Sequence, residues 1–288
     1  MAHAARYAPL PSRALIAVSG PDWRSFLQGQ LTQDVDTLAP GEARFAALLT
    51  PQGRLLFDLF IVGRGEGCWL DVAADRRDAL IQRLKIYRLR AKVEIAADDS
   101  PVAAIFNPYD PADPDYVAVS LTPASASQGG VWAADPRRHD LGLRRYGPAM
   151  VFGLSPATET DYHAHCLALG VPGAADWGED KTYPIEADFD LLNGIDFKKG
   201  CFVGQETTSR MKRRGVIKTR MLPITFDGPA PAPGSEVLAG ELRAGEVLSG
   251  VEGRAMALLR LDRIDGANLT VDGRPVRAEP PAWLSPQD

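Results

Sequence analysis

The chain has few cysteines and no long apolar run. Its 288 residues include three cysteines, Cys68, Cys166 and Cys201, at wide spacings. This pattern predicts neither a disulfide framework nor a cysteine zinc site, and a resident iron–sulfur cluster would need cysteines closer together. We therefore expect no stably bound metal. No apolar run approaches the length that spans a bilayer, so we expect no membrane association.

Other common signatures are also missing. Residues 1–11 contain neither a basic-then-apolar signal sequence nor a long transit segment rich in Arg and Ser. Together with the reducing environment that unpaired cysteines favour, this predicts a cytoplasmic protein. No glycine-rich phosphate loop of the Rossmann or Walker type occurs, which disfavours dinucleotide oxidoreductases and nucleotide hydrolases.

The composition, with 45% hydrophobic and 24% charged residues, is typical of a globular protein large enough for two or three subdomains. Hydrophobic periodicity predicts strands over 44–49, 54–62, 68–72, 92–95 and 116–121 and helices over 75–87 and 158–169. Residues 50–53 have turn composition, so the first two strands are expected to form a hairpin. Such an order is typical of an α+β fold with antiparallel sheets, and the short strands with glycine turns near the end predict a small β-barrel. The expected regions are an N-terminal α+β region (1–130), a second α+β region (131–220) and a C-terminal β-barrel (221–288).

The most informative stretch is residues 198–210, KKGCFVGQETTSR. Gly200 and Gly204 permit close approach to a ligand or to a facing chain segment. Cys201 follows two lysines and precedes a helix predicted to begin at Gln205. Both the positive charges and the helix dipole favour a thiolate, which makes the sulfur a candidate reactive group. The alternative is that Cys201 is a small buried hydrophobe.

Charge is distributed unevenly along the chain. The net charge is −5, yet residues 198–220 hold eight basic residues and one acid, so this segment carries +7 and the remainder −12. Such a segment suits a polyglutamate tail, a phosphate backbone or an acidic partner protein. A solvated helix end is the alternative.

Residues 199–206, together with Arg210 and residues 214–215, resemble the signature of the YgfZ family. Its members are folate-binding proteins that support iron–sulfur enzymes and are related to the aminomethyltransferase of the glycine cleavage system. Upstream segments 26–35, 50–54 and 87–93 occur in the expected order. The resemblance implies an α+β fold of the GcvT type, with antiparallel-sheet subdomains followed by a small C-terminal β-barrel.

The resemblance also implies a function. The chain would be a tetrahydrofolate-binding accessory protein that supports assembly or repair of iron–sulfur enzymes through Cys201. Glu186 would hold the pterin ring, because a carboxylate accepts two parallel hydrogen bonds; a turn cap is the alternative. The remaining expected binding residues are Lys199, Gly200, Gly204, Gln205, Glu206, Arg210, Gln28, Gln30 and Asp58.

Two other functions are compatible with parts of the sequence. One is a folate-dependent aminomethyltransferase or demethylase, although those relatives carry an Asp-Asp pair where this chain has Phe57-Asp58. The other is an RNA-binding module that uses residues 198–220, where Phe202 is the only aromatic available for base stacking. We expect folate and iron–sulfur clients or assembly factors as partners, no nucleic acid, and a monomer. One-carbon chemistry and thiol chemistry at Cys201 both stay open.

Overall fold

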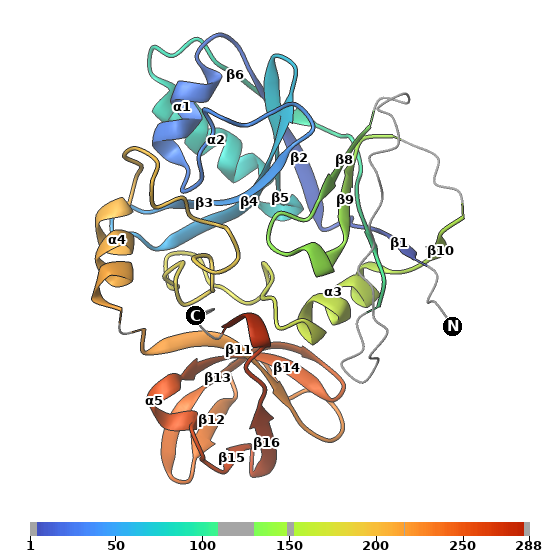
Figure 1. Cartoon of the computed structure of the whole chain (residues 1–288), viewed down its shortest axis with the longest axis vertical. Helices are drawn as coiled ribbons and strands as arrows, with labels where there is room; N and C mark the ends of the chain where they lie inside the picture. Colours follow the sequence, from blue (N-terminus) through green and yellow to red (C-terminus); the bar gives the residue numbers. More distant parts are fainter. Residues whose placement is uncertain (1–4, 109–129, 149–152, 216, 285–288) are drawn as a thin grey trace.

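The computed structural model describes residues 5–108, 130–148, 153–215 and 217–284. Two five-stranded sheets and a closed six-stranded barrel form the molecule, with the barrel at one end (Figure 1). This confirms the predicted class, antiparallel α+β layers followed by a C-terminal barrel. A predicted strand over 116–121 lies outside the described residues.

The first sheet has the strand order β3-β4-β5-β2-β6 and is antiparallel throughout. Its strands are β2 (Arg13–Ser19), β3 (Ala43–Leu49), β4 (Leu55–Arg64), β5 (Gly67–Ala73) and β6 (Glu94–Asp98). β4 is buried along most of its length because α1 (Trp23–Gln30) and α2 (Arg77–Arg88) cover one face, while the interior of the molecule covers the other. A short 3₁₀ turn, η1 (Ala74–Arg76), leads into α2.

The second sheet has the order β10-β1-β7-β9-β8, with only the β1 and β10 pair parallel. Its strands are β1 (Arg6–Pro9), β7 (Val102–Phe106), β8 (Val131–Ala134), β9 (Leu143–Tyr146) and β10 (Ser155–Pro156). A 3₁₀ turn, η2 (His139–Leu141), precedes β9, and α3 (Glu159–Ala168) packs against the sheet. α3 begins with a reciprocal capping box between Thr158 and Asp161, as the sequence pattern favours.

The barrel closes in the order β11-β14-β13-β12-β15-β16 around its own apolar core. Its strands are β11 (Thr219–Thr225), β12 (Glu236–Ala239), β13 (Leu242–Val251), β14 (Arg254–Arg260), β15 (Leu269–Val271) and β16 (Arg274–Ala278); α5 (Leu261–Ile264) and η3 (Ala282–Leu284) complete the region. A long irregular segment, residues 169–204, runs between the first sheet and the barrel before α4 (Gln205–Arg214) (Figure 1). No helix in the described residues is long and apolar enough to cross a membrane.

Candidate functional site

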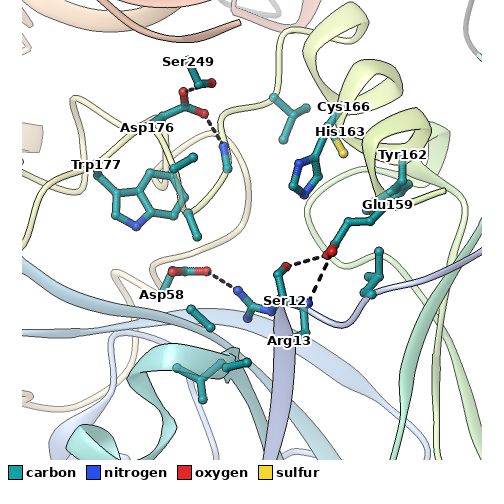
Figure 2. A pocket seen from close by; sticks show the side chains of 18 of the residues that line it. Ser12, Arg13, Asp58, Glu159, Tyr162, His163, Cys166, Asp176, Trp177 and Ser249 are labelled. Atoms are coloured by element: carbon teal, nitrogen blue, oxygen red, sulfur yellow. Dashed lines mark hydrogen bonds and ion pairs between the residues drawn. The ribbon is translucent and has the colours of Figure 1, made fainter. Parts of the chain in front are cut away.

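A cavity of about 710 Å³ lies where the two sheets, α3 and the barrel meet. Its walls come from β2, β4, β5 and β9, from one side of α3, from the 173–179 loop and from β13. Figure 2 shows Asp58, Trp177, Asp176 and His163 around this space. A cavity of this size is within the range of small-molecule sites in proteins.

Alternating arginines and aspartates form one wall of the cavity and the layer behind it. Arg13 pairs through Nη1 with Asp58 Oδ2 at 3.1 Å and through Nε with Asp71 Oδ1 at 2.6 Å. Arg144 Nη2 reaches the other oxygen of Asp71 at 2.6 Å, and Arg144 Nη1 lies 3.8 Å from Asp135 Oδ2. Burial alone would raise the pKa of Asp71, but Arg13 and Arg144 outweigh it and hold that pKa below its usual value. The carboxylate is therefore charged at neutral pH.

Asp135 continues the same series toward α3. Its Oδ2 accepts hydrogen bonds from Arg137 Nη2 at 2.8 Å and from the Tyr162 hydroxyl at 3.2 Å. These side chains are buried, so each charge needs its partner. The series joins the two sheets, since Asp71 lies in the first and Arg144 in the second.

The opposite wall is built from the 173–179 loop and the barrel. Asp176 accepts a hydrogen bond from the backbone N–H of Gly173 at 2.7 Å and another from the Ser249 hydroxyl at 2.5 Å. Burial raises the pKa of Asp176. Trp177 lies beside it and meets Phe189 edge-on at 5.4 Å between ring centroids. This wall thus offers an aromatic ring and a carboxyl group that is fixed in position.

Cys201 lies outside this cavity and is exposed, whereas Cys68 and Cys166 are buried. Burial raises the pKa of both of the other thiols. The alternative of a buried packing cysteine is therefore wrong for Cys201. Its neighbour Phe202 is buried and fixes the loop against the core.

Lys199 holds the loop that carries Cys201, residues 198–204, against the C-terminal end of α1. We call this segment the cysteine loop. Its ammonium donates to three backbone carbonyls, those of Gln28 at 2.8 Å, Leu31 at 2.7 Å and Gln33 at 2.9 Å. Burial lowers the pKa of Lys199 to about 8. These bonds account for the proximity of two sequence segments that lie about 170 residues apart. The ammonium is thus used in positioning the loop.

Gly204, in the second half of the motif, allows the chain to approach a facing segment closely. It has φ +82°, and a Cβ there would lie 2.6 Å from Thr50 O and 3.0 Å from the Gly53 Cα atom. Gly53 has φ +83° and meets Thr207 in return. The motif glycine therefore meets a facing chain segment, the turn between β3 and β4. Gly200, by contrast, has open space around it.

Of the three glutamines predicted to bind a ligand, one has a structural role. Gln28 donates to Asp34 Oδ1 at 2.7 Å and accepts from the Val35 N–H at 2.7 Å, so it holds the turn after α1. Gln30 and Gln205 are half-buried and also lie outside the cavity. Glu206 and Arg210 are exposed on α4.

The basic segment divides into surface and interior cations. Arg220 is buried and pairs with Asp188 at 2.6 Å and with Asp190 at 2.9 Å. Cations that solvent reaches remain on and around α4: Lys198, Arg210, Lys212, Arg213, Arg214 and Lys218. No described residue of 197–220 lines the cavity. These cations therefore form a surface beside the cysteine loop.

Glu186 and Asp58 occupy different places. Glu186 caps its own turn, with Oε2 accepting the Tyr183 N–H at 2.9 Å, and it is not a lining residue of the cavity. Burial raises its pKa. Asp58 does line the cavity and faces Arg13, while Phe57 packs beneath Arg76 with 4.7 Å between the guanidinium and the ring centroid.

Sequence reasoning missed most of the cavity. A signal was available in Asp71, because it interrupts an otherwise apolar strand and a buried charge requires a partner. Trp177 and Asp176 had no such signal, since they lie in an irregular loop. Among the residues that the structure describes, no group of His, Cys, Asp or Glu side chains could hold a metal ion.

Known proteins resemble this chain in fold and sequence. The crystal structure of aminomethyltransferase T of the glycine cleavage system from Bartonella henselae superposes with a TM-score of 0.73 at 17% identity, covering 98% of this chain and 87% of that one. The family model for the C-terminal β-barrel domain of CAF17 matches residues 218–286. The architecture is thus that of the GcvT class, with a CAF17-type barrel.

Sequence relatives define the family more closely. The mitochondrial iron–sulfur cluster assembly factor IBA57 of Homo sapiens is 32% identical over 280 residues, which cover 89% of this chain and 78% of that protein. The mitochondrial IBA57 homolog of Neurospora crassa is 32% identical over 298 residues, covering 96% of this chain and 66% of that protein. The chain belongs to the IBA57 family of iron–sulfur cluster assembly factors. Folate binding and a reactive cysteine stay predictions.

The relatives correct one prediction. Both IBA57 proteins are mitochondrial by name, so the prediction of a cytoplasmic protein is wrong. That prediction used the composition of residues 1–11 and the sparse, unpaired cysteines. The cysteines indicate a reducing environment without distinguishing one reducing compartment from another.

Proposed function

We propose that this protein is an accessory factor in iron–sulfur cluster assembly that acts through Cys201 and binds a tetrahydrofolate-type ligand in the central cavity. The observation that carries the proposal is the exposed Cys201 on a loop fixed by Lys199 and Phe202, in a chain whose relatives are named as cluster assembly factors. The fixed loop supports a role for the thiol at a partner's surface.

One cysteine limits what the protein does with a cluster. Iron–sulfur clusters are held by several thiolates, and the other two cysteines here are buried. Cys201 therefore contacts a cluster whose remaining ligands a partner protein supplies. Thiolate is a soft ligand suited to this contact. The cations of α4, which follow the loop directly in the sequence, suit an acidic partner.

The cavity supports the folate part of the proposal. Arg13 and Asp58 together offer a donor and an acceptor, which match the N–H groups and the carbonyl on the pyrimidine edge of a pterin. Trp177 supplies an aromatic face. A bound tetrahydrofolate would supply one-carbon chemistry, while these residues bind and orient it. Aminomethyl transfer is disfavoured, because Phe57 replaces one carboxylate and the other, Asp58, is ion-paired with Arg13.

Replacing Cys201 tests the first part. In cells that lack their own protein of this family, Cys201→Ser should abolish support of iron–sulfur enzyme activity while the fold is kept, since a hydroxyl is a poor ligand for soft metals. Cys68→Ala, which removes a buried thiol that does not line the cavity, is the matched control and should retain support. Full support by Cys201→Ser would remove the thiol from the mechanism.

Calorimetric titration with tetrahydrofolate tests the second part. Asp58→Asn should weaken binding roughly tenfold, because a charge-assisted hydrogen bond contributes about 1.5–3 kcal/mol. Glu186→Gln keeps size and removes the carboxylate that the sequence resemblance implies. Loss in Glu186→Gln alone would move the pterin site to the 183–186 turn, and failure of the wild type to bind would refute the folate proposal.

A further inference from the structure

The end of α2 exposes an apolar surface that the proposed function does not use. Leu89 is 87% exposed, Ile86 71% and Tyr87 40%. Within the described part of the chain, the only other large hydrophobic exposed to this degree is Leu242, on the barrel. Contiguous exposed apolar side chains with a polar rim mark interaction sites in soluble proteins.

The backbone directs Leu89 outward. α2 buries Leu80, Ile81 and Leu84 against the first sheet and then ends at Arg88. Leu89 follows with φ 48° and ψ −107°, a conformation that side-chain-bearing residues rarely adopt and glycine adopts freely. Strained backbone of this kind is kept where function requires it. A leucine here contributes nothing to the core and costs conformational energy.

Positive charge surrounds these apolar side chains. Residues 79–93 include five basic residues and no acid, although the whole chain carries −5. Together the exposed cations and apolar residues form what we call the basic–apolar patch: Lys85, Ile86, Tyr87, Arg88, Leu89, Arg90 and Lys92. Such a patch is complementary to a surface that combines carboxylates with an apolar side chain.

The patch and the cysteine loop are attached to opposite ends of one short helix. At the start of α1, Asp22 Oδ2 accepts the Lys92 N–H at 2.8 Å, and a Cβ on Gly20 would lie 2.4 Å from Lys92 O. At its end, Lys199 binds the Gln28 carbonyl. Figure 1 shows α1 between the α2–β6 connection and the loop before α4.

The span of α1 is short compared with a protein interface. Eight helical residues extend about 12 Å, at ~1.5 Å per residue. A standard interface covers ~800 Å² on each partner, which is roughly 30 Å across. The two points at which α1 holds the patch segment and the cysteine loop therefore lie closer together than one standard interface is wide.

We propose that the basic–apolar patch is the docking surface for an acidic protein partner that presents carboxylates around an apolar side chain, and that this partner is the one served by Cys201. The second clause rests on the proposed function. A protein is favoured over a membrane because three apolar side chains give little area for insertion. It is favoured over RNA because Leu89 and Ile86 have no part in phosphate or base contacts.

Binding of defined probes tests the patch directly. The probes are a synthetic acidic peptide with central Leu and Phe residues, a peptide of equal charge without apolar residues, vesicles containing phosphatidylserine, and a single-stranded RNA oligonucleotide. The wild type should bind the first peptide at least tenfold more tightly than the second. Leu89→Ser should remove this difference, and the matched control Leu242→Ser should keep it. Arg88→Glu with Arg90→Glu should weaken both peptides, whereas Arg277→Glu on the barrel should not.

A second variant separates docking from folding. Leu89→Gly relieves the unfavourable backbone conformation, so its unfolding midpoint should be equal to or above that of the wild type while preference for the apolar peptide is lost. Equal affinity of the wild type for both peptides, or tighter binding to vesicles or RNA, would overturn the proposal. So would an equal loss in Leu242→Ser.

A cellular comparison separates this inference from the proposed function. Leu89→Ser should reduce support of iron–sulfur enzymes severalfold in cells lacking their own family member, and Leu242→Ser should not. If Leu89→Ser is fully active while Cys201→Ser is inactive, the docking inference fails and the proposed function stands. If both are fully active, the proposed function fails, and peptide binding alone decides whether the patch recognises acidic proteins.

Discussion

At the scale of residues, Lys199 has a different role from the one its position beside the cysteine motif suggests. In the sequence it is a positive charge two positions from Cys201. In the structure its ammonium is surrounded by the carbonyl oxygens of Gln28, Leu31 and Gln33. A lysine can satisfy three acceptors with its three N–H donors, so the charge is used in joining two chain segments.

Replacing Lys199 should therefore free the loop. Lys199→Met keeps the apolar stem and removes the donors, which should lower the free energy of unfolding by about 2 kcal/mol and speed hydrogen exchange at residues 196–203. Lys198→Met, at the neighbouring lysine on the surface, should change stability by less than about 0.5 kcal/mol. Denaturant unfolding and hydrogen exchange measure both. Equal behaviour of the two variants would exclude the positioning role.

At the scale of elements, α4 is placed by the residue at its start rather than by a buried face. Thr208 is its only buried residue, and its last three residues are basic. Gly204 at its start contacts the turn at residues 50–53. The sequence predicted the helix and the turn separately. Their contact depends on two glycines, each of which accepts a positive φ and a close backbone approach.

Two alanine substitutions at the ends of α4 separate the cost of an unfavourable backbone conformation from the cost of a steric clash. Gly215 has φ +68°, and a Cβ there would meet nothing within 4 Å, so Gly215→Ala should cost about 1–2 kcal/mol from backbone conformation alone. Gly204→Ala carries a similar φ and also places Cβ 2.6 Å from Thr50 O, so its cost should be clearly larger. Thermal or denaturant unfolding checks the difference. Equal costs would show that the turn moves away freely.

At the scale of the whole molecule, the two sheets are joined by buried charge as well as by apolar packing. Asp71 of β5 binds Arg13 of β2 and Arg144 of β9, and the carboxylate is fully buried. The cavity lies in front of this junction, so the charges that join the sheets also form the polar wall of the site. The side chains that stabilise the junction of the sheets and those that line the cavity thus belong to one ion-pair series.

Asp71→Asn should show how strongly the free energy of unfolding depends on these buried ion pairs. It leaves two buried guanidinium groups with less compensating charge, and breaking a buried pair typically costs about 3–5 kcal/mol. Glu246→Gln breaks the exposed pair between Glu246 and Arg243 on the barrel and should cost less than about 1 kcal/mol. Urea unfolding of both variants measures the contrast. A small loss in Asp71→Asn would mean that apolar contacts alone hold the sheets together.

The sequence by itself determined the local elements, the α+β class and the informative cysteine motif, because periodicity, turn residues and motif spacing act over short distances along the chain. The GcvT type of fold came from the resemblance of that motif to the YgfZ family. The sequence predicted the hairpin around residues 50–53, the α3 helix, the α4 helix and a small C-terminal barrel. Tertiary structure alone decided which side chains meet. It placed Asp58 in the cavity and Glu186 in a turn, used Lys199 inside the protein, and brought Arg144 to Asp71 across 73 residues. Such contacts depend on how sheets, loops and barrel pack in three dimensions, and no local pattern in the chain encodes that packing.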